Sequence, residues 1–246
     1  MATIVIPARE KSSRLPNKLL IEVNGKPIIR WTVENCLNAK NIDKVIVATD
    51  SERIKEALKS LDIDIFITPE NIKSGSDRIA YVLKYIEDED IINVQGDEPL
   101  VNVEDIENLA NVLKNEDITT LAYPIDKEED FKNPNIVKVV LDKDNYALYF
   151  SRSPIPFPRD ISFNEMTKSI KVYKHIGIYG YKKEILYKFS YELEPSPIEE
   201  VERLEQLRFL YNGYKIKVIV AKEETVGIDT EEDLKKFKLL LNQGKF

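Results

Sequence analysis

The chain has 246 residues, 43% hydrophobic and 32% charged, a balance that is typical of a globular protein and excludes a disordered one. No apolar run approaches the roughly 18 residues that a membrane span requires, and the net charge of −7 disfavours nucleic acid and anionic membranes as partners. The single cysteine, Cys36, cannot form an internal disulfide, which indicates a reducing compartment, and we expect the cytoplasm.

The first 120 residues alternate between short apolar runs and segments with helical spacing. The chain opens with a buried strand rather than a secretory signal. Ser51 is suited to cap the second helix. Such alternation predicts an α/β fold, a Rossmann-like three-layer sandwich with a mostly parallel sheet. The expected strands cover residues 3–6, 44–48, 63–67 and 91–94, and the expected helices cover 28–39, 51–61, 77–86 and 103–113.

The pattern changes from about residue 118. Strands are expected at 137–141, 146–150 and 172–181, and the polar run 142–145 predicts a turn between the first two. These strands form a hairpin or a mixed extension of the sheet. A helix at 197–210, a strand at 215–220 and a helix at 230–241 capped by Thr230 complete a single domain over residues 1–246.

The loop after the first strand is strongly cationic. Residues 9–18 contain four cations, Arg9, Lys11, Arg14 and Lys18, against one acid, Glu10. In an open α/β sheet, the loop that leaves the carboxyl end of a strand lines the ligand crevice, and its cations and free N–H groups suit a triphosphate. The spacing is not that of a Walker A loop. From this segment alone, a solvated surface loop is the alternative.

Two aspartates are candidate magnesium ligands. Asp97 follows a strand and a Gln-Gly step, where its carboxylate can hold Mg²⁺ against phosphate oxygens. Asp229 follows Gly227-Ile228 before the last helix, where a helix-capping role is the alternative.

Two other acidic pairs fit the Asp-x-Asp pattern of glycosyltransferases less well. The pair at 88–90 precedes its strand and lies at the wrong end of the sheet, and the pair at 142–144 lies in the hairpin turn. We expect neither pair to be catalytic.

A second group of polar residues lies in the later half of the chain. Arg152 and Arg159 flank a proline-rich stretch, and guanidinium groups of this kind bind carboxylates bidentately. His175 is the only histidine, so a histidine metal cluster is excluded, and a lone histidine in a strand is usually structural.

Eight segments of the chain, taken together, carry a resemblance to one family. They are IPAREKSSRLPNK, ATDS, SGSDR, NVQGDEP, YFSRSPIPFPR, HIGIYGY, LEQLRFLYNGYKI and GIDTEEDL. On these segments the chain is similar to the 3-deoxy-manno-octulosonate cytidylyltransferases, or CMP-Kdo synthetases, from Ala2 to about Leu241. The resemblance implies that CTP and the sugar acid Kdo give CMP-Kdo and pyrophosphate for lipopolysaccharide biosynthesis.

The resemblance also implies roles for individual residues. The catalytic group is Lys18, Arg14, Asp97 and Asp229, of which the two aspartates hold Mg²⁺. The nucleotide is bound by Pro7, Ala8, Arg9, Arg14, Lys18, Ser74, Gly75, Arg78 and Gln95. The sugar acid is bound by Arg152, Arg159, His175, Tyr179, Glu205 and Gln206. Family members are typically homodimers, so the subregion at roughly 124–190 is expected to serve dimerisation and substrate binding.

The first loop departs from the family's usual pattern. Glu10 stands for an aromatic residue, Asn17 for a glycine and Leu19 for a proline, while Ser76 keeps the hydroxyl of the usual threonine. Because Glu10 adds negative charge near a phosphate site, we expect its side chain to point away from that site. The alternatives are a cytidylyltransferase for 8-amino-Kdo or a sialic acid, a metal-dependent glycosyltransferase, and a non-catalytic nucleotide-binding protein.

Overall fold

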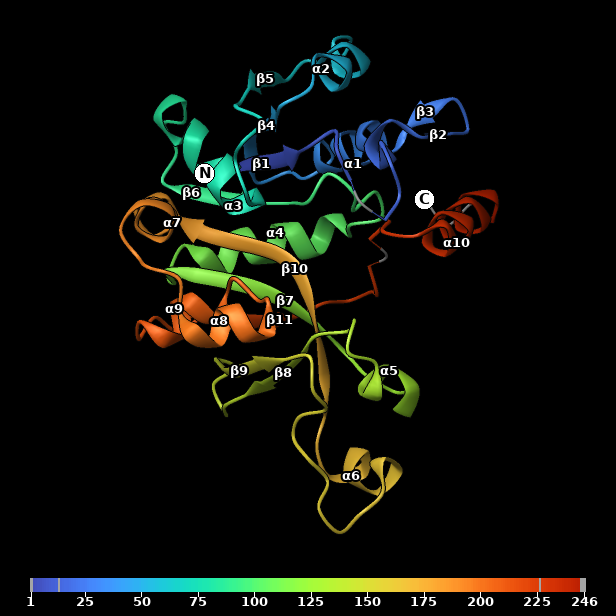
Figure 1. Ribbon diagram of the computed structural model, residues 1–246, viewed down its shortest axis with the longest axis vertical. Helices are drawn as coiled ribbons and strands as arrows, with labels where there is room; N and C mark the ends of the chain where they lie inside the picture. The colour runs from blue at the N-terminus through green and yellow to red at the C-terminus, as the bar shows by residue number, and fades with distance from the viewer. Residues whose placement is uncertain (1, 13, 226, 244–246) are drawn as a thin grey trace.

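A twisted sheet organises the computed structural model, which describes residues 2–12, 14–225 and 227–243 (Figure 1). Over these residues the sheet has nine strands, and its main path runs in the order β11-β7-β10-β6-β1-β4-β5. The strands on this path are β1 (Ala2–Ala8), β4 (Ile42–Thr49), β5 (Asp64–Ile67), β6 (Asp90–Asn93), β7 (Ile118–Pro124), β10 (Tyr173–Lys182) and β11 (Lys217–Val220).

Most neighbouring strands of this path are parallel. β1 pairs in parallel with β4 and β6, β4 with β5, and β7 with β11, whereas β10 runs antiparallel to both β6 and β7. The predicted mostly parallel α/β sheet is therefore confirmed. A separate two-stranded sheet, β2 (Glu22–Val23) with β3 (Lys26–Pro27), lies at the turn after the first loop.

The central strand is buried on both faces. Every residue of β1 is buried, and its side chains alternate between two apolar clusters, with Ile4 and Ile6 in one and Val5 in the other. The first cluster contains Ile28 of α1, Leu109 of α4 and Phe237 of α10, and the second contains residues of α3, α7 and α9. Helices therefore cover both faces, which confirms the three-layer arrangement.

Two helices begin at the capping residues that the sequence predicted. Ser51 caps α2 and Thr230 caps α10, as predicted, because each side chain accepts a backbone N–H from the first turn of its helix. The helices are α1 (Ile28–Cys36), α2 (Glu52–Leu58), α3 (Gly75–Val82), α4 (Val103–Leu113), α5 (Glu128–Lys132), α6 (Phe163–Ser169), α7 (Lys183–Tyr191), α8 (Pro197–Glu202), α9 (Leu207–Tyr211) and α10 (Glu231–Asn242), with 3₁₀ turns η1 (Lys18–Leu20) and η2 (Leu83–Tyr85). No helix of the described chain is long and apolar enough to cross a membrane.

The single helix predicted over residues 197–210 is wrong. The chain forms α8 and α9 there, separated at Arg203, whose φ of 56° is left-handed. No glycine or proline marks this break. The Arg152 guanidinium donates to the carbonyls of Glu202 at 2.8 Å and Arg203 at 3.4 Å, so a tertiary contact stabilises the interruption.

A hairpin and an arm extend the sheet at one side. β8 (Lys138–Leu141) and β9 (Ala147–Ser151) flank the predicted turn, and β8 also pairs with β10. Figure 1 shows α6 at the end of an arm that projects from the sheet. A small apolar cluster that includes Phe131, Phe163 and Met166 packs between α5 and α6. The predicted hairpin extension is confirmed, whereas its use in dimerisation stays a prediction.

The hairpin turn provides a test of local backbone strain. Asn145 closes it with a left-handed φ of 60°, and its N–H donates to the Asp142 carbonyl at 3.1 Å. We expect Asn145→Ala to lower the free energy of unfolding by about 1 kcal/mol, because alanine lacks the short polar side chain that lets asparagine tolerate the left-handed conformation. Asn145→Gly is expected to stay within about 0.5 kcal/mol of the parent in urea unfolding. Equal stability of the two variants would contradict this account.

Candidate active site

The loop after β1 turns back toward the sheet and delivers Lys18. The Ser12 hydroxyl donates to the Leu15 carbonyl, and the Lys18 backbone N–H donates to Ser12 Oγ at 3.4 Å. Asn17, at the position before η1, has a left-handed φ of 53°, a conformation that asparagine tolerates. This path brings the Lys18 side chain to two carboxylates. Ser13 of this loop and Val226 near Asp229 lie outside the described residues.

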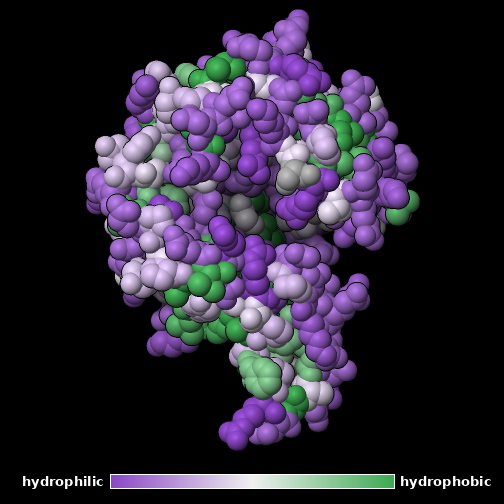
Figure 2. All heavy atoms as spheres, viewed as in Figure 1, coloured by the Kyte–Doolittle hydropathy of each residue, from purple (hydrophilic) through white to green (hydrophobic). Residues whose placement is uncertain are grey.

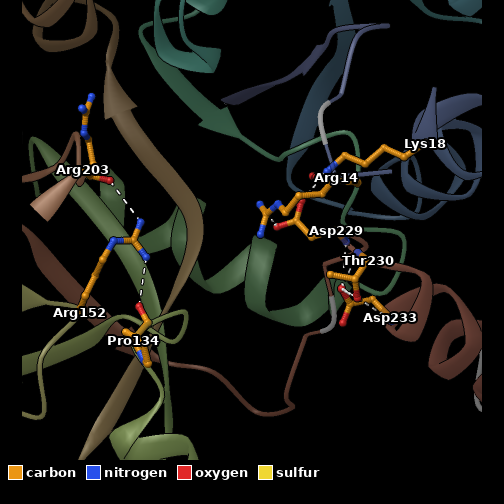
Figure 3. A network of polar contacts seen from close by, with 9 residues as sticks. Arg14, Lys18, Pro134, Arg152, Arg203, Asp229, Thr230 and Asp233 are labelled. Atoms are coloured by element: carbon orange, nitrogen blue, oxygen red, sulfur yellow. Dashed lines mark hydrogen bonds and ion pairs between the residues drawn. The ribbon is translucent and has the colours of Figure 1, made fainter. Parts of the chain in front are cut away.

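Lys18 joins the two predicted aspartates. Its Nζ donates to Asp97 Oδ2 and, at 2.7 Å, to Asp229 Oδ1, while Arg14 contacts Asp229 Oδ2 at 2.7 Å. The Ile228 N–H also donates to the Asp97 carbonyl at 2.9 Å, which fixes the two acidic segments to one another. Figure 3 shows Arg14 against Asp229, with Thr230 and Asp233 below them in the view, at the start of α10. The structure thus brings all four predicted catalytic residues together.

The charges of this cluster favour ionised side chains. Burial alone would lower the pKa of Lys18, but the carboxylates of Asp97 and Asp229 outweigh it and raise the pKa above its ordinary value. No group of three or more histidine, cysteine or acidic side chains arranged to hold a metal occurs among the described residues. Two carboxylates do fit Mg²⁺, which prefers one or two carboxylates together with phosphate oxygens and water.

Glu98 is a third acid beside this pair, and sequence reasoning did not single it out. Its Oε2 is buried and has no hydrogen-bond partner among the described residues, and a Cβ on Gly227 would lie 2.7 Å from its Oε1. Burial, followed by the charges of Asp97 and Asp229, raises the pKa of Glu98 to about 8 against the opposing effect of Lys18. The only sequence signal was its place directly after Asp97.

Two adjacent cavities gather the predicted nucleotide residues. One of about 200 Å³ and one of about 400 Å³ share Arg9, Ile72 and Arg78. A larger cavity of about 590 Å³ between α3 and α7 is lined by none of the predicted site residues. The smaller shared cavity is lined by Pro7, Arg9, Ile72, Lys73, Ser74, Gly75, Arg78, Gln95 and Glu205.

The start of α3 forms one wall of the smaller cavity. Ser74 caps this helix by accepting the Asp77 N–H at 3.0 Å, so the remaining N–H groups of the first turn are free for an anion. A Cβ on Gly75 would lie 3.3 Å from both Gln95 and Pro7, so glycine permits this close approach. Three of the predicted nucleotide residues line neither cavity. The Ala8 side chain is buried in the core, and Arg14 and Lys18 lie in the cluster with the two aspartates.

Four predicted sugar-acid residues lie on or near β10 and α9. His175 Nε2 lies 3.0 Å from Thr120 Oγ1, which also lies 2.9 Å from the Ile178 carbonyl. Burial lowers the pKa of His175 to about 3, which keeps the ring neutral. Burial is the main cause that raises the pKa of Tyr179, and the charge of the nearby Glu205 carboxylate raises it further.

Several of these polar groups are buried without partners. The Tyr179 hydroxyl and Gln206 Nε2 have no hydrogen-bond partner within the described chain, and Glu205 accepts one hydrogen bond, from Ser76 at 3.0 Å. Burial raises the pKa of Glu205. Unsatisfied buried donors are costly, so this set is suited to a polar ligand that would complete it.

The two predicted arginines are not part of this group. The Arg152 guanidinium donates to backbone carbonyls, including Pro134 at 3.2 Å, and Figure 3 shows it apart from Arg14 and Asp229. Arg159 lies on the arm with 89% of its side chain exposed, and its Nε lies 3.8 Å from Asp160 Oδ2. Lys138 was not among the predicted site residues. It is buried next to Arg152, and its Nζ donates to three backbone carbonyls, including that of Arg152 at 2.6 Å.

Known proteins resemble this chain over nearly its whole length. A family model described as cytidylyltransferase matches residues 3–217. The 3-deoxy-manno-octulosonate cytidylyltransferase of Thermodesulfovibrio yellowstonii is 48% identical over 253 residues, covering 98% of this chain and 99% of that protein. The protein of the same name from Chloroherpeton thalassium is 44% identical over 245 residues, covering 98% and 97%. A solved CMP:2-keto-3-deoxy-manno-octonic acid synthetase complexed with CTP has a TM-score of 0.91 and 37% identity, covering 99% of each chain.

Glu98 provides a test of this site by the dependence of stability on pH. Since the pKa of Glu98 is about 8 in the fold and near 4.5 otherwise, its contribution to stability is present below about pH 4.5 and lost as the pH rises through 8. We therefore expect Glu98→Gln, in EDTA, to melt roughly 2–4 °C or more above the parent near pH 8.5 and to show little gain near pH 5. Exposed Glu87→Gln serves as the control. A gain that does not vary with pH would contradict this assignment.

Proposed function

This chain belongs to the 3-deoxy-manno-octulosonate cytidylyltransferase family, and we propose that it transfers CMP from CTP to the anomeric hydroxyl of 3-deoxy-D-manno-octulosonate (Kdo). Pyrophosphate is the second product, and CMP-Kdo serves lipopolysaccharide biosynthesis. One observation carries the proposal: Lys18 and Arg14 converge on Asp97 and Asp229 at the edge of the sheet where the strands end.

The proposed reaction is an in-line displacement at the α-phosphorus of CTP. The anomeric oxygen forms a bond to phosphorus, the bond from phosphorus to the bridging oxygen of the β-phosphate breaks, and the electron pair leaves with pyrophosphate. The hydroxyl proton passes to solvent. Lys18 and Arg14 stabilise the departing negative charge, so positioning and electrostatics supply most of the catalysis without a dedicated base.

We further propose that Asp97 and Asp229 hold Mg²⁺ against the phosphates. Support comes from the donor set, since two carboxylates lie on one ammonium group and the remaining ligands would be phosphate oxygens and water. The ion, when bound, supplies charge neutralisation at the phosphate oxygens and lowers the pKa of the attacking hydroxyl.

The sugar acid is assigned to the buried polar set on β10 and α9. The neutral His175 ring, the Tyr179 hydroxyl and the Gln206 amide offer hydrogen-bond groups to a ligand rich in hydroxyls. Glu205 borders the smaller nucleotide cavity, so a sugar held there lies beside the nucleotide. Arg152 and Arg159 stay predicted contacts of the sugar acid. A related sugar acid, 8-amino-Kdo or a sialic acid, is the alternative substrate.

We place the enzyme in the cytoplasm. The free thiol of Cys36 is buried, and burial raises its pKa to about 12, which suits a chain that needs no oxidising compartment.

We also propose a homodimer formed through the subregion 124–190. Apolar side chains are exposed along it, with 79% exposure at Phe157 and smaller fractions at Leu148, Ile161 and Ile170. Figure 2 shows green, hydrophobic atoms on the projecting arm. Exposed apolar residues gathered on an arm of this kind mark an interaction surface.

Pyrophosphate release tests the transfer directly. With CTP, Mg²⁺ and one sugar acid at a time, we expect release with Kdo and not with a sialic acid. Asp97→Asn is expected to reduce turnover by roughly 10³-fold or more, because it removes charge that acts on the transition state. EDTA is expected to abolish release and added Mg²⁺ to restore it.

The matched control is Asp144→Asn, an exposed acid of the discarded hairpin-turn pair, which should leave turnover unchanged. Release confined to another sugar acid would retain the transfer and replace the substrate. Near-normal turnover in Asp97→Asn would refute the catalytic role of Asp97. If folded protein releases no pyrophosphate with any of the sugars, the result would favour a non-catalytic nucleotide-binding protein.

The dimer is tested by light scattering after gel filtration. We expect the parent to have about twice its chain mass of 28.4 kDa, and Phe157→Glu to shift it toward the monomer, since a buried charge without a partner is costly. Leu239→Glu, an exposed leucine on α10 outside the subregion, is the control. A monomeric parent, or a dimer unaffected by Phe157→Glu, would count against this interface.

A further inference from the structure

Glu10 ties the first loop to the start of α2. Its carboxylate accepts the Ser51 hydroxyl and contacts Arg53 at 2.7 Å, and its backbone N–H donates to Asp50 Oδ1 at 3.0 Å. The side chain is directed at α2, and Glu10 also lines the cavity of about 400 Å³, so the expectation that it points away from a phosphate site stays a prediction. Three bonds from one residue thus hold the point at which the loop leaves β1.

The Ser51 hydroxyl is the hydrogen-bond donor to Glu10. Its Oγ accepts the Ile54 N–H at 3.2 Å as the cap of α2, so its own proton is free for Glu10. A carboxylate at a helix N-terminus is also stabilised by the helix dipole. The Ser51 hydrogen bond, followed by Arg53, outweighs partial burial and lowers the pKa of Glu10, so the Glu10 carboxylate is charged at neutral pH.

The link continues from the loop into the nucleotide cavities. Asp50, which holds the Glu10 N–H, pairs through its other oxygen with Arg78 at 2.9 Å, and Arg78 also donates to Thr68. Arg78 is only 3% exposed and lines both cavities. The loop is thereby connected to α3, which carries the opposite wall.

The loop needs such an anchor because its charges repel one another. Arg9 and Lys11 flank Glu10, and Arg14 and Lys18 follow without a helix or strand between them. Arg9 belongs to the wall that the two cavities share. The neighbouring pair of Lys11 with Glu70 is highly exposed and contributes little.

We propose that Glu10 is a positioning residue for the triphosphate of CTP: with Ser51 and Arg53 it clamps the loop so that Arg9 is already in place at the cavity wall. The proposal rests on the proposed function. In this proposal Glu10 acts through the loop, because its carboxylate is engaged by Ser51 and Arg53 although the residue borders the cavity of about 400 Å³. Its loss therefore exposes the loop to more conformations, and nucleotide binding must bear the cost of ordering it.

A double-mutant cycle on CTP binding tests the clamp. We expect Glu10→Ala and Arg53→Ala each to raise the Kd for CTP by roughly 3- to 20-fold, and the double variant to be no worse than the poorer single variant. The turnover number at saturating CTP and the KM for the sugar acid should change by less than about threefold. Arg53 is 65% exposed, so its removal does not threaten the fold. Lys55→Ala, which removes a cation from the same helix, is the control.

Tryptic cleavage within residues 9–18 gives a second readout that needs no catalysis. Faster cleavage there in both single variants, with parental cleavage in Lys55→Ala, supports the clamp. Additive effects on CTP affinity together with unchanged cleavage would overturn it. If the parent releases no pyrophosphate yet the variants weaken CTP binding and loosen the loop, the proposed function fails while the clamp stands.

Discussion

The bridge from Lys18 to Asp97 and Asp229 is the contact on which the site depends, because it joins the ends of three strands. Lys18 follows β1, Asp97 follows β6, and Asp229 follows β11. These ends share one edge of the sheet because β10 runs antiparallel to both β6 and β7. Two reversals in succession restore the original direction, so β7 and its parallel neighbour β11 point the same way as β6.

The acidic side chains of this cluster outnumber its cations. Asp97, Asp229 and Glu98 face two cations, Lys18 and Arg14, and one Glu98 oxygen is buried without a partner in the described chain. Taken alone, such an arrangement reduces stability, since a buried acid without a partner is costly. Functional sites are where local rules of this kind are broken. The same reasoning applies to the unpaired Tyr179 and Gln206 groups, which lack partners that a polar ligand offers.

Sequence patterns predicted the nucleotide half of the fold better than the rest. Periodicity and capping located β1, α2 and α10 because these elements are buried or capped by local chemistry. β7 was not predicted, since Thr119 and Thr120 interrupt its apolar run although both are fully buried. The break at Arg203 depends on contacts with Arg152 from a distant strand, which no local pattern reveals. For the site, the resemblance named the residues that converge, but not the carbonyl contacts that occupy Arg152.

The central place of β10 has a consequence for how the chain assembles on the ribosome. β1, β4, β5 and β6 lie within the first 93 residues and pair with one another, so this half can form early during synthesis. β7 must wait for its strand pairing, because in the described sheet it is linked to that half through β10, which is made some fifty residues later and brings long-range pairing. Asp229 arrives almost last of all. A nascent chain therefore holds the cationic loop of residues 9–18 well before it holds Asp229, so the cluster around Lys18 is completed only near the end of synthesis.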